Sequence, residues 1–317
     1  MAGIGYYQFI EKLEKDFEQR KEETVEELCK LMKKILRPEN FMISYTGERE
    51  SLETVQKLAG AVKAGLGTEP VEKSEEKLTC TKKNANEIDA AEKILREIKP
   101  KGMIFLGGSV ANFQKGFANI SVPSVLATLV SDELDFPNLS MVGVDDRAAA
   151  YQAVSYLIQQ GHRKIAVLGG PATSHPSMMR RQGAQQAMED AGIRFEDKLY
   201  GLSNYDFESA YHAMNGLLAR RAEFTALFAM SDVIAFGAIR ALVSAGLRVP
   251  EDVSVIGFDG ITMSRYCVPV MTTIVQPSEQ IALQSIELLV RQIEHGTPAQ
   301  TVTLQPELQQ GESVRAL

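Results

Sequence analysis

Two side-chain types are scarce in this chain of 317 residues: tryptophan is absent, and cysteine occurs only three times. The cysteines are Cys29, Cys80 and Cys267, an odd number at distant positions. Such a set does not form the disulfide framework of a small secreted protein, and it favours a reducing compartment. Without tryptophan, an aromatic contact to a ligand has to come from tyrosine or phenylalanine.

Long apolar segments are missing as well. No run approaches the roughly 18 residues that span a bilayer, and the chain does not open with a signal-peptide pattern. We therefore expect a cytoplasmic protein with no membrane partner. Basic residues are fewer than acidic ones, and the net charge is −7. This balance gives no support for direct contact with DNA, because DNA-binding domains are usually basic.

Patterns typical of catalysis or metal binding are absent too. The four histidines never show the His-x-x-Glu-His spacing of a zinc peptidase. Gly107-Gly108-Ser109 is neither a phosphate-binding loop nor a nucleophile elbow, and Gly169-Gly170 lacks the full dinucleotide fingerprint. We expect no enzyme activity, no cofactor and no metal.

The chain does contain a regular alternation of apolar strands and amphipathic helices. It is clearest from Ser140 to Ile193, where a strand ends on Asp145-Asp146, a helix follows, and residues 165–171 form a second strand that runs into glycines. A strand, a helix and a parallel strand make the right-handed crossover of an α/β sheet. Ligands of such sheets bind beyond the carboxyl ends of the strands.

The same alternation continues on both sides of that stretch. Helices are expected at residues 88–98, 178–191, 208–218, 232–245 and 278–295, and strands at 102–109, 123–127, 226–230 and 254–258, with a further segment of unspecified type at 199–205. This pattern predicts two parallel-sheet lobes with a cleft between them.

The first 84 residues differ from the rest in composition. They hold 15 Lys or Arg and 16 Asp or Glu, so 31 of 84 residues are charged, against 44 of the other 233. Residues 1–40 are expected to form a charged helical extension that ends at Pro38. A strand, a helix and a strand are expected at 41–45, 50–66 and 77–81. A composition boundary therefore lies near Asn84.

A series of short motifs follows in order along the second part of the chain. They are Val144-Asp145-Asp146-Arg147, Gly161–Ile165, Gly169-Gly170-Pro171, Arg180-x-x-Gly183, Ala229-Met230-Ser231-Asp232, Ala235-x-Gly237-Ala238, Gly246–Pro250, Val253–Asp259 and Thr272-Thr273-Ile274-x-Gln276. In order and spacing this set resembles the effector-binding core of the LacI/GalR family of bacterial transcription regulators. The resemblance covers roughly residues 87–317.

The resemblance implies an α/β fold with two doubly wound parallel-sheet lobes of the periplasmic-binding-protein-like type, after the N-terminal helical extension. It places residues 41–160 and 278–305 in the N-terminal lobe, and residues 161–277 and 306–317 in the C-terminal lobe. It also implies a homodimer, a small sugar-like effector between the lobes, and operator DNA as the partner of the family. Effector binding in such a regulator shifts the balance between two lobe arrangements.

The early segment lacks the DNA-reading part of such a regulator. Residues 1–83 show no helix-turn-helix with its small-residue turn, and no hinge helix. This segment resembles instead a C-terminal segment of an insulinase-like zinc peptidase, in its expected order of helices and strands and in short matches at Gly3–Tyr7 and Phe41–Gly47. We expect no tight DNA binding by this chain, although its relatives read operators. Whether residues 1–83 are a native domain or a fused segment stays open.

Arg180 and Asp259 are the first candidates for the effector site. Arg180 offers five donors in a fixed fork, which suits adjacent hydroxyls; the alternative is a surface arginine paired with Asp190 or Glu189. The resemblance makes Asp259 an acceptor in the cleft, whereas its local sequence also suits a turn. Arg180→Ala and Asp259→Ala are each expected to weaken effector binding and to leave the fold intact.

Ser231 and Asp232 come between a strand and a helix. They are expected to cap the helix and also to accept hydrogen bonds from a sugar. The family usually has Asn-Asp here, so Ser231 departs from its pattern. Tyr205 is either a platform for a sugar ring or a core aromatic. Further candidates are Ser109, Asp145, Asp146 and Tyr266.

The sequence thus predicts the effector-sensing core of a LacI/GalR-type regulator, with a sugar or sugar derivative as effector. Two alternatives stay open at this point. One is a solute-binding protein for transport, which would need a secretory signal or a lipoprotein cysteine. The other is a peptidase-like fragment fused to a sensor core.

Overall fold

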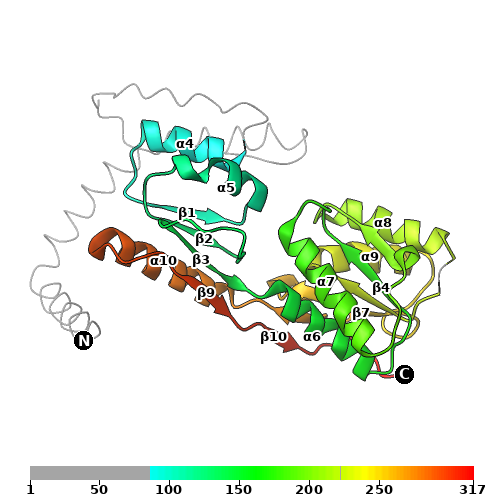
Figure 1. Cartoon of the computed structure of the whole chain (residues 1–317). Coiled ribbons are helices and arrows are strands. Elements are labelled where there is room, and N and C mark those ends of the chain that lie inside the picture. The colour runs from blue at the N-terminus through cyan, green and yellow to red at the C-terminus, as the bar shows by residue number, and fades with distance from the viewer. Residues whose placement is uncertain (1–85, 222) are drawn as a thin grey trace, which may run out of the picture. The chain divides into compact units, whose positions relative to one another are not determined.

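The computed structural model describes residues 86–221 and 223–317, which form two sheets that are each covered by helices (Figure 1). The helical extension expected at residues 1–40, and the elements expected at 41–45, 50–66 and 77–81, lie outside the described residues. No helix in the described part is both long enough and apolar enough to cross a membrane.

The first sheet has its described strands all parallel, in the order β1-β2-β3-β9. They are β1 (Met103–Leu106), β2 (Ser124–Ala127), β3 (Leu139–Val144) and β9 (Thr301–Leu304). One face carries α4 (Glu87–Glu97), α5 (Val110–Gly116) and η3 (Phe117–Asn119), and the other carries α10 (Ser278–His295). We call this part the first lobe.

Alternation along β2 divides the core of the first lobe into two clusters. Leu126 packs in one cluster with Phe113 of α5, whereas Val125 and Ala127 pack in the other with Leu288 of α10. Successive side chains of a strand point to opposite faces, so helices on both faces require apolar residues at every position of the strand. This explains why β2 is buried at every position.

The second sheet has the order β10-β8-β7-β6-β4-β5, and β10 is antiparallel at one edge. Its strands are β4 (Ile165–Gly169), β5 (Tyr200–Leu202), β6 (Ala226–Ala229), β7 (Ser254–Asp259), β8 (Thr272–Val275) and β10 (Glu307–Gln309). The helices are α6 (Asp146–Gln159), α7 (His175–Asp190), α8 (Phe207–Ala219) and α9 (Asp232–Ser244), with η4 (Asp197–Leu199) and η5 (Thr262–Arg265) in connections. We call this part the second lobe.

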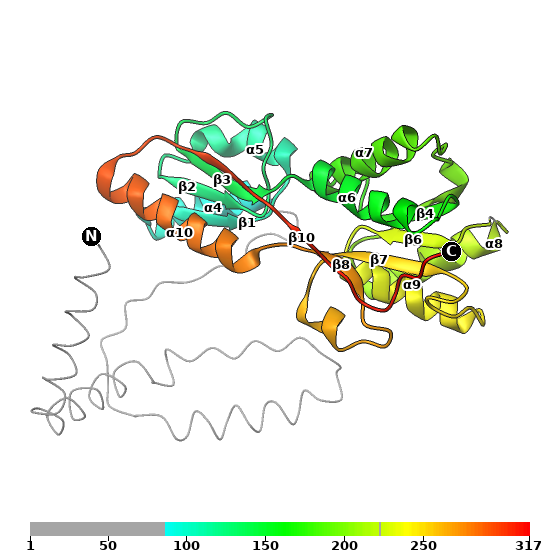
Figure 2. The ribbon, with the colours of Figure 1, turned by 90° about the horizontal axis from the view of Figure 1, so that it is seen from below.

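The helices of the second lobe pack as pairs. Helices α6 and α7 lie against each other, as do α8 and α9, and the two pairs cover opposite faces of the sheet (Figure 2). The two parallel-sheet lobes predicted from the sequence are therefore confirmed. The antiparallel β10 is a difference in detail, at an edge where a short strand returns from the other sheet.

Helix α6 packs in a different lobe from the one expected. The sequence placed residues up to 160 in the N-terminal lobe. Ala149, Val154 and Leu157 of α6 are instead buried in the core of the second lobe. Because α6 packs there, the chain crosses between the sheets directly after β3, not near Gly161.

The chain crosses between the sheets twice more. Residues 276–277 join β8 of the second sheet to α10 of the first, and residues 305–306 join β9 to β10 (Figure 2). The sequence led us to expect lobe boundaries between residues 277 and 278 and between residues 305 and 306. Each lobe is thus built from segments that are distant in the sequence.

Helix α7 begins earlier than the sequence suggested, at His175 instead of near Met178. The side chain of Ser174 accepts a hydrogen bond from the amide of Ser177, and Pro176 occupies the first turn. Both features favour a helix start at this point. The seven-residue helix α5 was not predicted at all, because so short a segment carries too few turns to show a helical period.

Candidate functional site

Several candidate side chains gather at the carboxyl ends of β3, β6 and β7. Asp146 begins α6 shortly after β3, Ser231 and Asp232 come shortly after β6, and Asp259 is the last residue of β7. Arg180 reaches the same edge from α7. Strands β6 and β7 are parallel neighbours in the second sheet, so their carboxyl ends lie on the same side of it. Asp146 reaches this place although β3 belongs to the first sheet, because α6 packs in the second lobe.

Arg180 is the centre of this cluster, and only 6% of its surface is exposed. Its Nε donates to Oδ1 of Asp146 at 2.7 Å, and its Nη1 donates to the backbone carbonyl of Met230. The same Nη1 lies 3.6 Å from Oδ1 of Asp259. The guanidinium also stacks over the ring of Phe258, 3.7 Å from the ring centroid. Arg180 is therefore held by contacts on several sides.

Burial and neighbouring charges act in opposite directions on this cluster. Burial by itself would lower the pKa of Arg180, but the carboxylates of Asp146 and Asp259 outweigh it and raise that pKa. Burial raises the pKa of Asp259, although the positive charge of Arg180 opposes the change. Pairing of Arg180 with Asp190, which the sequence left open, does not occur; Asp190 accepts a hydrogen bond from Tyr151 instead.

Ser231 and Asp232 are both buried with partners inside the protein. The hydroxyl of Ser231 accepts a hydrogen bond from the amide of Ile234 and caps α9. Asp232 accepts from the hydroxyl of Thr273 at 2.6 Å and from the amide of Ile261 at 2.8 Å. Burial raises the pKa of Asp232 to about 6, and these hydrogen bonds offset only part of the effect. The capping role expected for Ser231 is observed.

Three non-glycine residues at or shortly after strand ends have a positive backbone φ: Thr128 (70°), Tyr205 (60°) and Asp259 (109°). Such conformations cost about 1–3 kcal/mol each and cluster at functional sites. Asp259 is held in place by Gln276, whose backbone amide donates to the carbonyl of Asp259 and whose side chain donates to Oδ1 at 2.7 Å. The strain at Asp259 is thus maintained by a residue of the connection between the lobes.

A pocket of about 360 Å³ opens beside Asp259 and draws residues from both lobes. We call it the hinge pocket. It is lined by Thr128, Ser278 and Ile281 of the first lobe, by Asp259, Gly260, Ile261 and Thr262 of the second lobe, and by Gln276 of the connection. Thr128, Ser278 and Gln276 are not among the site residues expected from the sequence. For Gln276 the signal was present, because it closes the Thr-Thr-Ile-x-Gln motif.

Tyr205 packs closely on the glycines after β4. A Cβ atom at Gly170 would lie 2.2 Å from the Tyr205 ring, so only glycine leaves room for it. The tyrosine hydroxyl lies 3.5 Å from Oγ of Ser174. The ring is partly buried against the second-lobe core and partly exposed. The platform role and the core role therefore both stay compatible with its position.

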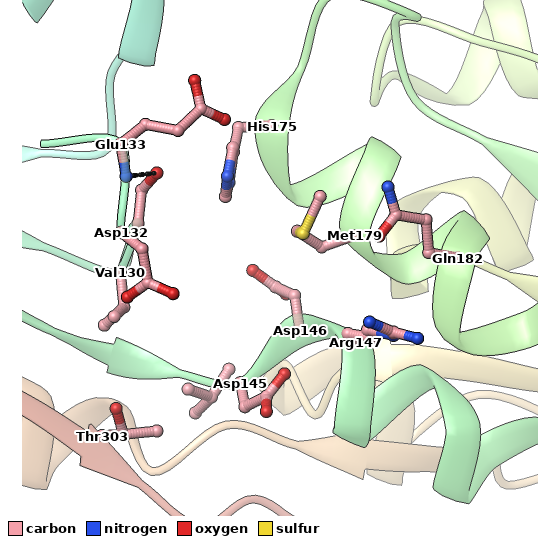
Figure 3. A pocket seen from close by; sticks show the side chains of 12 residues that line it. Val130, Asp132, Glu133, Asp145, Asp146, Arg147, His175, Met179, Gln182 and Thr303 are labelled. Carbon is pink, nitrogen blue, oxygen red and sulfur yellow. Dashed lines mark hydrogen bonds between the residues drawn. The ribbon is translucent and has the colours of Figure 1, made fainter. Parts of the chain in front are cut away.

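A second pocket, of about 480 Å³, is also lined by residues of both lobes (Figure 3). We call it the acidic pocket. It is lined by Val130, Ser131, Asp132, Glu133, Val144, Asp145, Asp146, Arg147, His175, Met179, Gln182 and Thr303. Asp146 lines the acidic pocket and Asp259 lines the hinge pocket, so Arg180 contacts a wall residue of each.

The remaining candidates lie elsewhere or have local roles. Ser109 precedes α5 without a capping hydrogen bond from its side chain, and Tyr266 is 79% exposed. Neither lines the hinge pocket or the acidic pocket. Asp145 caps α6 by accepting from the amide of Ala148. Among residues 86–221 and 223–317, no group of three His, Cys, Asp or Glu side chains could hold a metal ion.

The two-lobed fold is similar to that of known proteins. A family model described as the periplasmic binding protein-like domain matches residues 154–314. The chain belongs to the periplasmic binding protein-like family. The matched residues of this family run from α6 through the whole second sheet and include Arg180, Asp232 and Asp259.

Two curated relatives from this family's regulators are similar to the chain. It is 36% identical over 221 residues to the HTH-type transcriptional regulator MalR of Clostridium butyricum, covering 69% of this chain and 66% of that protein. It is 38% identical over 172 residues to the HTH-type transcriptional repressor CytR of Escherichia coli strain K12, covering 54% of this chain and 50% of that protein. The chain thus spans between half and two thirds of the length of these relatives.

A solved structure supports the same assignment. The transcriptional regulator CelR in complex with cellobiose superposes with a TM-score of 0.66 at 29% identity, over 71% of this chain and 69% of that one. Together with the two regulators, this identifies the described lobes as an effector-binding core of the LacI/GalR type, as the sequence motifs predict.

Proposed function

We propose that this chain is the effector-sensing core of a LacI/GalR-type transcription regulator, and that a neutral sugar or sugar derivative binds in the hinge pocket. The observation that carries the proposal is the buried Arg180, held between Asp146 and Asp259 beside a pocket that both lobes line. The relatives named above are transcription regulators, which supports sensing over catalysis.

The polar groups around the hinge pocket suit a polyhydroxylated ligand. Asp259 and the hydroxyls of Thr128 and Ser278 can accept hydrogen bonds, while the hydroxyls and the amide of Gln276 can donate them. Ile281 adds an apolar contact for a ring face. Sugars carry alternating donors and acceptors on a partly apolar ring, and one related regulator was solved with cellobiose.

The position of the pocket also suggests how binding is transmitted. Residues of both lobes line it, so a ligand that contacts both stabilises the lobe arrangement in which those contacts are best. A ligand shifts such an equilibrium only by its difference in affinity for the two arrangements. In regulators of the proposed type this shift acts on operator binding by a homodimer in the cytoplasm, whereas this chain itself is expected not to bind DNA tightly.

Binding is tested by thermal-shift screening of a panel of neutral sugars and nucleosides, followed by titration calorimetry with any stabilising member. At 100 times the dissociation constant, a ligand stabilises the folded state by about 2.7 kcal/mol, which is readily detected. Asp259→Asn removes the charge from the acceptor and keeps its shape. We expect it to weaken binding about ten- to a hundredfold, because a charge-assisted hydrogen bond is lost.

The control is Glu251→Gln, which removes the charge of an exposed carboxylate that lines neither pocket. It should leave affinity unchanged. If no panel member stabilises the protein, or if Asp259→Asn binds as tightly as the original chain, the hinge pocket is not the effector site.

Arg180→Ala is a poor probe of binding, in contrast to the expectation from sequence. The substitution would leave two carboxylates next to each other without their cation in a buried cluster. Removing one partner of a buried ion pair costs about 3–5 kcal/mol, so loss of stability would mask any change in affinity.

A further inference from the structure

The acidic pocket has walls of like charge. Asp132 and Glu133 reach it from the connection between β2 and β3 in the first lobe, and Asp145 and Asp146 from the start of α6 (Figure 3). Arg147 is the one Lys or Arg among the lining residues. A hollow between carboxylates on two walls has a negative potential, which concentrates cations.

His175 supplies an independent observation at the same place. It lies in the first turn of α7, lines the acidic pocket and is only 8% exposed. Its Nδ1 is buried and has no hydrogen-bond partner within the part of the chain that the structure describes. A buried polar atom without a partner is costly, and it indicates a ligand or a water that the site is built to receive.

The carboxylates differ in how far they are already engaged. Asp146 is bound to Arg180, Asp145 caps α6, and Glu133 accepts from the side chain of Gln114. Asp132 makes no hydrogen bond or ion pair within the described residues. It is the carboxylate with the most acceptor capacity left for a ligand.

We propose that the acidic pocket binds a small organic ammonium compound, with ammonium groups donating to Asp132 and Glu133 on one wall and to Asp145 or to Nδ1 of His175 on the other. Ammonium carries donors only, which matches the carboxylates, and Nδ1 of His175 accepts from it in the tautomer that has its proton on Nε2. The volume of about 480 Å³ suits a small organic molecule. No three metal-binding side chains in residues 86–221 and 223–317 are close enough together to hold an ion.

This site is distinct from the hinge pocket, with Arg180 between them. A cation next to Asp146 competes with Arg180 for that carboxylate, and Arg180 in turn contacts Asp259 of the hinge pocket. The two sites therefore share one charge network, and an effect of either ligand on the other must be reciprocal.

The test is titration calorimetry of the full chain with 1,4-diaminobutane at neutral pH and constant ionic strength. The neutral 1,4-butanediol and magnesium chloride serve as comparison ligands. We expect saturable binding of the diamine and none of the diol. The double substitution Asp132→Asn with Glu133→Gln should weaken diamine binding about tenfold or more.

The matched control is Glu189→Gln, an exposed carboxylate on α7 that does not line the pocket, and it should bind the diamine like the original chain. Asp132 and Glu133 are exposed, so their variants should fold, and equal melting temperatures check this. His175→Leu should also weaken binding, whereas His175→Asn, which keeps an acceptor, should restore part of it.

Several results would overturn the proposal: no saturable diamine binding, equal affinity for the diol, magnesium binding without diamine binding, or unchanged affinity in the double variant. Stabilisation by a neutral sugar is a separate readout that these variants should leave in place. Failure of the ammonium site can therefore be told apart from failure of the hinge-pocket proposal.

Discussion

Buried aspartates at neighbouring strand ends have different partners. Asp146 lies against the cation Arg180, and Asp259 has the same cation 3.6 Å away. Asp232 is fully buried, yet its hydrogen-bond donors are a hydroxyl and a backbone amide. Burial raises the pKa of Asp232 to about 6, and its neutral donors oppose this effect only in part, because they stabilise a carboxylate less than a cation does.

Asp232 should therefore make the stability of the protein depend on pH in a definite direction. Its pKa in the folded state, about 6, exceeds the value of 3.8 for a free aspartate, so the folded state binds the proton more tightly. The contribution of this group to stability is greatest below pH 4 and falls as pH rises to above 6. A shift of about two pKa units corresponds to about 3 kcal/mol.

Asp232→Asn removes this titration and keeps the shape. The amide oxygen can accept from Ile261, and the amide nitrogen can donate to the Thr273 hydroxyl. As pH rises from 4 to 7, the free energy of unfolding of the variant should increase by about 2–3 kcal/mol relative to that of the original chain. Urea unfolding of both proteins at several pH values measures this difference. Parallel stability profiles would show that Asp232 does not titrate in this range.

At the scale of elements, the contact between α6 and α7 depends on one glycine. A Cβ atom at Gly183 of α7 would lie 2.0 Å from the backbone carbonyl oxygen of Arg147 in α6. A backbone atom cannot move aside as a flexible side chain can. The two helices therefore approach this closely only because position 183 has no side chain.

Gly183→Ala should force α6 and α7 apart and lower the free energy of unfolding by about 1–3 kcal/mol or more. Gly216 of α8 provides the matched comparison, because it is exposed and a Cβ atom there meets nothing within 4 Å. Gly216→Ala should instead stabilise the protein by about 0.5–1 kcal/mol, through higher helix propensity. Urea unfolding at pH 7 compares the two, and effects of the same sign would contradict the packing argument.

At the scale of the whole described molecule, the chain returns to the second lobe for its last residues. Ser313 is fully buried; its hydroxyl donates to the carbonyl of Val255 at 2.6 Å and accepts from the amide of Thr272 at 2.8 Å. It thus joins β7 to β8. Nearby, Nε2 of His162 lies 3.1 Å from the carbonyl oxygen of Arg315. The tail acts as a structural part of the lobe that carries Asp259.

Ser313→Ala should therefore destabilise the protein, because it leaves a buried amide and a buried carbonyl without this partner. The expected loss is about 1–3 kcal/mol in the free energy of unfolding. Ser244→Ala is the control: that hydroxyl is exposed and bonds only within α9, so the change should stay within about 0.5 kcal/mol. Calorimetric melting of the three proteins tests this, and equal losses would mean that the tail contributes little.

Elements whose signal is local can be predicted from the sequence alone. The apolar run of β3 and the helical stripe of α10 each depend on residues within one element, so their type could be predicted from period alone. The positions of Arg180 and Asp259 beyond strand ends followed from the order of elements and from family motifs. The capping role of Ser231 needs only the residues next to it.

What only the tertiary structure decided are the pairings between distant residues. Arg180 lies 34 residues from Asp146, and Gln276 lies 17 from Asp259. The tertiary structure also decided in which lobe α6 packs and that Thr128 lines the hinge pocket. Local patterns specify which face of an element is apolar, but many partners can cover such a face. Which partner covers the face depends on the packing of the complete chain. Burial and charge interactions require residues to be close in space, and they do not depend on how far apart the residues are in the sequence.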